Sequence, residues 1–167
     1  MPKDSIVPSA VDPFLRKTTV QGHVHDEAAA FQGGVSGNAG LFSNAYEVAC
    51  IHQMILNGGT LDGRRYLSPE TIHTFTSTRS RISRRRLGFD APDKQTPAHS
   101  PCAPSVSAST YGHTGFTGTC AWVDPDQQLV YVFLCNRTYP QAWNTKLSAL
   151  DIRPRIQEAV YKALLHE

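Results

Sequence analysis

The chain has 167 residues, of which 40% are hydrophobic and 18% are charged, and its formal net charge at pH 7 is +2. This composition is typical of one globular domain or most of one, and it excludes a chain that is disordered throughout. The near-neutral charge excludes a general electrostatic footprint for nucleic acid. The longest apolar run is far below the ~20 residues that a membrane-spanning helix needs, and we find no signal-peptide pattern in these residues.

The first half of the chain predicts a helical and loop-rich lobe. Residues 1–22 are polar and punctuated by prolines, so we expect an extended segment with little regular structure. In residues 23–90, apolar side chains recur at helical spacing after a capping residue, Ser43 or Asn44, and a Gly-Gly pair ends that helix. A second, shorter helix should follow a Ser-Pro pair and cover about residues 69–76.

The second half predicts an antiparallel sheet and a last helix. Residues 87–90 predict one short strand, and residues 91–108, rich in proline and serine, predict loops around a site entrance. Three apolar runs between about residues 109 and 137 are joined by short turns, which predicts an antiparallel meander. Residues 152–165 carry an apolar side chain every four positions, so they predict an amphipathic helix across the back of the sheet. We therefore expect an α+β fold.

The first strand of this meander has an unusual composition. From Tyr111 to Thr119 it reads Tyr-Gly-His-Thr-Gly-Phe-Thr-Gly-Thr. Glycine in a strand loses packing and conformational entropy, so we expect another backbone or a ligand to approach closely at each one. His113 adds a titratable side chain. We interpret this segment as a strand that lines an active site.

The triplet His113-Thr114-Gly115 resembles the third signature of the penicillin-recognising serine hydrolases, the family of β-lactamases, D-alanyl-D-alanine carboxypeptidases and related esterases. Residues 24–26, 33–43 and 67–71 also resemble segments of the class C-like branch, and the resemblance covers about residues 5–165. It implies the C-terminal part of the β-lactamase/transpeptidase-like fold. It also implies attack by a serine on a β-lactam, peptide or ester carbonyl, which gives an acyl-enzyme without a cofactor.

The nucleophile motif of this family is missing from the chain. None of the five lysines has a serine three positions before it, and there is no Tyr-x-Asn. The formal Ser-x-Asn match, Ser36-Gly37-Asn38, falls where the family does not place that motif. We therefore expect residues 1–167 to be a partial, C-terminal domain that is inactive without an N-terminal half. Because the family pairs the third strand with one from that half, residues 128–135 should form an exposed apolar edge.

The resemblance also implies a role for each of four residues. The Phe116 amide is implied as an oxyanion donor, because a backbone N–H beside a glycine has no side chain in the way. His113 would orient the substrate and, when protonated, attract its anion, while Thr114 donates a hydroxyl hydrogen bond. Gly115 would keep the strand surface clear. The partner would be a small-molecule or peptidoglycan-peptide substrate, and the parent protein would act in the periplasm or cell envelope.

Two alternatives for the function remain open. The first is a catalytically inactive binding or interaction module derived from the same fold, which keeps the pocket strand without the nucleophile. The second is a metallohydrolase, because His23-Val24-His25-Asp26 resembles the start of a metal-binding motif. No further ligands follow it, so we expect no metal there, and we expect His25 and Asp26 to tie down the loop by hydrogen bonds.

The basic segment and the cysteines carry weaker signals. Five arginines between positions 79 and 86 form either a solvated loop or a rim patch that attracts an anionic substrate. The four cysteines lack the spacing of a zinc or redox motif, so we expect packing residues. A disulfide between Cys120 and Cys135, on neighbouring predicted strands, stays open because the register is not fixed by sequence.

Overall fold

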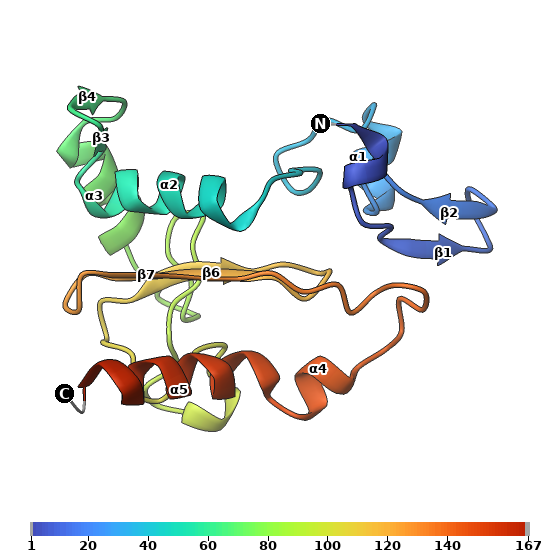
Figure 1. Ribbon diagram of the computed structural model, residues 1–167. Helices are drawn as coiled ribbons and strands as arrows, with labels where there is room; N and C mark the ends of the chain where they lie inside the picture. The colour runs from blue at the N-terminus through green and yellow to red at the C-terminus, as the bar shows by residue number, and fades with distance from the viewer. Residues whose placement is uncertain (1, 166–167) are drawn as a thin grey trace.

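The computed structural model of the protein describes residues 2–165. Figure 1 shows three layers, in which a sheet lies between helix α2 (Ala45–Leu56) on one face and helix α5 (Ile152–Leu165) on the other. The strands of this sheet, in spatial order, are β5 (Tyr111–Thr114), β6 (Cys120–Asp124) and β7 (Leu129–Phe133). The α+β class, the meander and the last helix are therefore confirmed.

Both strand pairs of the sheet are antiparallel. His113 on β5 lies opposite Ala121 on β6, and Trp122 on β6 lies opposite Tyr131 on β7. Within residues 2–165, β7 has a single strand neighbour, so it forms an edge of the sheet as expected. Its side chains are mostly half-buried rather than exposed, because α2 packs against β6 and β7.

The main core lies between the sheet and α5. Trp122, which is 1% exposed, and Tyr131 pack with Tyr161 of α5. Cys102 and Val106 close the same cluster from the loop that precedes β5. This loop was expected only around a site entrance, yet its second half is part of the core.

The N-terminal segment contains more regular structure than expected. A 3-10 turn at Lys3–Ser5 is followed by a hairpin of β1 (Ala10–Asp12) and β2 (Thr18–Val20). The Asp12 carboxylate accepts hydrogen bonds from three backbone N–H groups of the connecting turn. The expectation of little regular structure was wrong, because an aspartate at a strand end stabilises a turn locally.

The N-terminal helices begin at capping side chains. Asp26 precedes α1 (Glu27–Phe31), Asn44 precedes α2, and Ser68 precedes α3 (Pro69–Ser77). Each cap accepts a hydrogen bond from the backbone N–H three residues further along. Of the two candidate caps for α2, Asn44 is therefore the one that the helix uses.

The regions between these elements differ from the prediction in two places. A hairpin of β3 (Thr60–Leu61) and β4 (Arg64–Arg65) lies between α2 and α3, around an Asp-Gly turn whose residues both have positive φ. The strand predicted for residues 87–90 is wrong, because only Asp90 pairs there, in an isolated bridge to Gly112.

A short 3-10 helix (Pro97–His99) and α4 (Lys146–Ala149) complete the elements. None of the described helices is long and apolar enough to cross a membrane.

Candidate active site

Gly112 fixes β5 against its neighbours one residue before His113. A Cβ atom at position 112 would overlap the carbonyl oxygen of Ala121 and the ring of Trp122 on β6. On the other side, the backbones of Gly112 and Asp90 exchange two hydrogen bonds, of 2.7 and 3.1 Å. The close backbone approach that the sequence predicted therefore occurs at this glycine, and it holds the strand that carries His113.

The His113 side chain is exposed at the end of β5 and makes two hydrogen bonds. Its Nδ1 lies 2.7 Å from the Thr114 carbonyl oxygen, and its Nε2 lies 2.5 Å from Nη1 of Arg85. A guanidinium only donates and a carbonyl only accepts, so Nδ1 carries the proton and Nε2 accepts. The Arg85 guanidinium places a positive charge at the end of β5. Sequence reasoning did not assign Arg85, because the two residues are 28 positions apart.

The other arginines of the basic segment are mostly bound to the protein rather than solvated. Arg84 makes a two-point ion pair with Asp90, with Nε–Oδ1 at 2.8 Å and Nη2–Oδ2 at 2.9 Å. Asp90 is 1% exposed. Arg79 and Arg86 both donate to the same backbone carbonyl, that of Ala108. These contacts anchor the segment and direct one half-exposed guanidinium to the end of β5.

A four-residue turn follows β5 and leaves two of its backbone donors, the N–H groups of Phe116 and Thr117, without an acceptor among the described residues. The Gly118 N–H donates to the Gly115 carbonyl at 3.0 Å, and the Gly115 N–H donates to the Thr119 carbonyl at 2.7 Å. The N–H and C=O of a trans peptide point in opposite directions, so the Phe116 N–H points out of the turn. Within residues 2–165, nothing accepts a hydrogen bond from this N–H. It therefore has the free orientation that an oxyanion donor needs, while the role itself stays a prediction.

Thr114 and Gly115 lie between the histidine and this turn. Thr114 is half-buried, and its hydroxyl makes no hydrogen bond to another group in the part of the chain that the structure describes. A Cβ atom at Gly115 would overlap the hydroxyl of Thr119. A larger residue at position 115 would therefore require the Thr119 side chain to move. The structure brings the four predicted site residues together at one end of the sheet.

The N-terminal lobe reaches this end of the sheet through His25. Its ring stacks on that of Phe116, with 5.3 Å between centroids. Hydrogen bonds from the α1 backbone and from Asn38 hold the pKa of Asp26 below its usual value, so Asp26 ties down the loop. The Ser36 hydroxyl donates to Asn38 in the same network. Among the described residues, no group of three or more His, Cys, Asp or Glu side chains could hold a metal ion.

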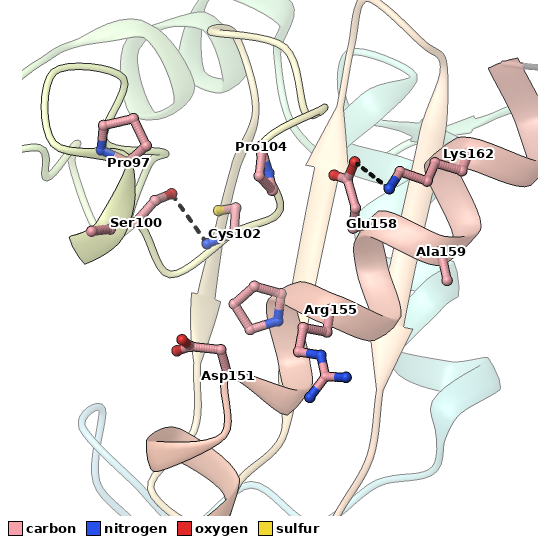
Figure 2. A pocket seen from close by; sticks show the side chains of 11 residues that line it. Pro97, Ser100, Cys102, Pro104, Asp151, Arg155, Glu158, Ala159 and Lys162 are labelled. Carbon is pink, nitrogen blue, oxygen red and sulfur yellow. Dashed lines mark hydrogen bonds and ion pairs between the residues drawn. The ribbon is translucent and has the colours of Figure 1, made fainter.

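A cavity of about 440 Å³ lies away from these residues, between the loop before β5 and α5 (Figure 2). Its charged lining residues include Asp151, Arg155, Glu158 and Lys162, which carry equal numbers of positive and negative charges. Glu158 accepts two hydrogen bonds from Ser105, so it already binds the loop to the helix. None of the candidate site residues lines this cavity, and we treat it as separate from the site.

The four cysteines, Cys50, Cys102, Cys120 and Cys135, are all free thiols. The disulfide considered between the last two is therefore not formed. Burial raises the pKa of Cys120 to about 11 and also raises that of Cys102, so neither is a thiolate at neutral pH. Both are packing residues, as predicted.

Comparison with known proteins adds to this geometry. The family model described as Beta-lactamase matches residues 4–151. The chain belongs to the beta-lactamase family.

Similar curated proteins carry the name "Putative D-alanyl-D-alanine carboxypeptidase". The one from Salmonella gallinarum is 37% identical over 139 residues, which are 81% of this chain and 32% of that protein. The one from Escherichia coli K12 is 38% identical over 130 residues, which are 76% of this chain and 29% of that protein. This chain therefore spans about a third of the length of these relatives.

One solved structure is also similar. It is described as a novel penicillin-binding protein homolog from Caulobacter crescentus, and it is 27% identical with a TM-score of 0.45. The alignment covers 56% of this chain and 26% of that one.

Proposed function

We propose that this chain forms the C-terminal wall of the active site of a serine hydrolase that acts on a β-lactam, a cell-wall D-Ala peptide or an ester. The observation that carries the proposal is the end of β5, where a free Phe116 N–H lies two residues after the Thr114 hydroxyl and three after His113. The nucleophilic serine would come from a longer polypeptide. The family and the names of the relatives support this reading.

The chemistry divides between the absent serine and the residues described above. The serine oxygen would form a bond to the substrate carbonyl carbon, and the leaving group would depart with a proton, which gives the acyl-enzyme that water then hydrolyses. The Phe116 N–H would donate to the carbonyl oxygen while it carries negative charge. His113 and Thr114 would orient the substrate.

Arg85 favours a substrate with a carboxylate near the scissile bond. A guanidinium binds a carboxylate through two parallel hydrogen bonds, and the Arg85 side chain is 49% exposed beside His113. β-Lactams and D-Ala peptides carry such a carboxylate, whereas a neutral ester does not. Of the five arginines that could form a rim patch, we therefore propose that Arg85 is the one that attracts the substrate anion. A location of the parent protein in the periplasm or cell envelope belongs to the same proposal.

The test compares Arg85→Gln with Arg81→Gln in the full-length protein. Arg81 belongs to the same segment, and its side chain makes no hydrogen bond or ion pair among the described residues. For a substrate with a free carboxylate, we expect Arg85→Gln to lower kcat/KM about tenfold or more, since charge-assisted hydrogen bonds contribute ~1.5–3 kcal/mol. The methyl ester of that substrate should lose less than about twofold. Equal losses on both substrates would remove Arg85 from carboxylate binding.

A noncatalytic binding module remains the second candidate. Such a module would use the strand β5 and the turn after it to bind a ligand without acyl transfer. A full-length protein that binds a D-Ala peptide but forms no covalent adduct with it, or with a penicillin, would establish this function instead of the hydrolase.

A further inference from the structure

Arg137, in the segment after β7, holds the turn that carries the Phe116 amide. Its backbone N–H donates to the Thr117 carbonyl at 2.8 Å, and its side-chain Nε donates to the Phe116 carbonyl at 2.9 Å. Arg137 therefore donates hydrogen bonds to two successive carbonyl groups of the turn, those of Phe116 and Thr117. Neither the family motif nor the spacing of the sequence assigned Arg137 a role.

The far end of the same side chain is also fixed. Its Nη1 donates to the carbonyl of Ala142 at 3.1 Å and to that of Asn144 at 2.8 Å. The guanidinium carbon lies 4.8 Å from the centroid of the Phe116 ring. A planar guanidinium with separate Nε and Nη donors can reach both loops at once, whereas a lysine ammonium has one donor centre.

These contacts set the direction of the Phe116 N–H. Phe116 joins two peptide planes, and Arg137 holds the second through its carbonyl, while the hydrogen bond between Gly118 and Gly115 holds the first. The Phe116 N–H lies in the first plane, so the hydrogen bond between Gly118 and Gly115 sets its direction. Arg137 holds the second plane, which restricts rotation about the two bonds of Phe116 that join the planes. Position 118 of the turn favours glycine, because its φ of +110° is rarely adopted by other residues. A Cβ atom there would also lie only 2.9 Å from side-chain atoms of Cys135 and Leu147.

We propose that Arg137 is a positioning residue that orients the Phe116 N–H toward the oxyanion. The proposal rests on the proposed function, since it needs that N–H to act as a donor. Removing an oxyanion donor costs about 10²- to 10³-fold in kcat, and a misplacement of about 1 Å costs up to about 10²-fold. We therefore expect a loss between about 10- and 100-fold when Arg137 is replaced.

The test uses the full-length protein with Arg137→Gln and Arg137→Lys, and with Arg64→Lys as the matched control. Arg64 is an exposed arginine that lies over the ring of Tyr66, away from the turn. Acylation rates are measured with an ester and with its thionoester, because sulfur accepts backbone hydrogen bonds poorly. Binding of phenylboronic acid, which forms a tetrahedral adduct with an active serine, is measured in parallel.

If Arg137 positions the donor, both variants lose about 10- to 100-fold in acylation by the ester and in boronate affinity. The ratio of ester to thionoester rates should fall toward one, and KM for the ester should change less than about twofold. Arg64→Lys should match the wild type in all of these. If Arg137→Gln fails to fold, Arg137→Lys, which keeps the charge, decides the question.

Two results would overturn the inference, and they differ from each other. A wild-type protein that acylates normally, with an unchanged ester to thionoester ratio in both Arg137 variants, contradicts the positioning role alone. A folded wild-type protein that reacts with neither ester nor boronate contradicts the proposed function, and the positioning role with it.

Discussion

Replacing Tyr161 by phenylalanine should destabilise the protein by about 2 kcal/mol. The Tyr161 hydroxyl is buried and donates to Oδ2 of Asp124 at 2.7 Å, which links α5 to the end of β6. Hydrogen bonds to charged groups contribute ~1.5–3 kcal/mol. Asp124 keeps four other hydrogen bonds, two of them from Ser107, so the carboxylate stays ionised and the loss stays near the middle of that range.

The same change should alter the dependence of stability on pH. Burial alone would raise the pKa of Asp124, but hydrogen bonds from Ser107 and Tyr161 bring it below the ordinary value of 3.8. A carboxyl with a lowered folded pKa stabilises the fold above its unfolded pKa, and this contribution is lost as pH falls through the folded pKa. The difference between wild type and Tyr161→Phe should thus be complete at neutral pH and shrink below about pH 4.

Urea unfolding followed by the fluorescence of the buried Trp122 measures both effects. Tyr66→Phe is the control, because Tyr66 is 53% exposed and its hydroxyl makes no hydrogen bond among residues 2–165. It should change the free energy of unfolding by less than about 0.5 kcal/mol. A Tyr161→Phe variant that is as stable as Tyr66→Phe would refute the reasoning.

Two further predictions concern the sheet and its thiols. Gly112→Ala should unfold or strongly destabilise the protein in thermal melts, because its Cβ would overlap β6, whereas Gly37→Ala, with open space around it, should melt within a few degrees of the wild type. Cys102 and Cys120 should react slowly with a disulfide reagent in the native state, because burial raises the pKa of both, while the half-buried Cys50 and Cys135 react faster. Fast labelling of all thiols would show that the core between the sheet and α5 is open.

The sequence predicted elements whose signals are local. The caps at Asn44 and Ser68 depend on neighbours within a few positions, and both appear in the structure. The four-residue apolar spacing predicted α5 as a helix, which is confirmed. It did not predict the buried face, because Ile156 and Leu164 are exposed while Tyr161 and Gln157 are buried. The three glycines between Tyr111 and Thr119 predicted close approach, and Gly112, the one that lies in β5, meets β6 as expected. Such features can be predicted because they depend on residues only a few positions apart: a capping side chain bonds to the first turn of its helix, and apolar residues recur at the helical period.

The parts of the site that the sequence did not predict depend on distant contacts. Arg85 meets His113 only because Arg84 and Asp90 anchor the basic segment beside β5. Arg137 reaches the turn after β5 only because β7 returns beside β6. No spacing rule encodes such contacts, so the sequence left the arginine segment open between a solvated loop and a rim patch, and it assigned no role to Arg137. The prediction of a strand at residues 87–90 was wrong for a related reason. A strand forms only where a neighbouring strand can pair with it, and the local sequence does not show whether one is present.

We propose that this chain completes the active site of a serine hydrolase. The most direct measurement is intact-protein and peptide mass spectrometry of the full-length protein after incubation with benzylpenicillin or a fluorophosphonate. We expect one covalent adduct on a serine outside residues 1–167, and slower adduct formation in His113→Ala. A folded protein that forms no adduct with either reagent, or an adduct on a residue within this chain, would contradict it.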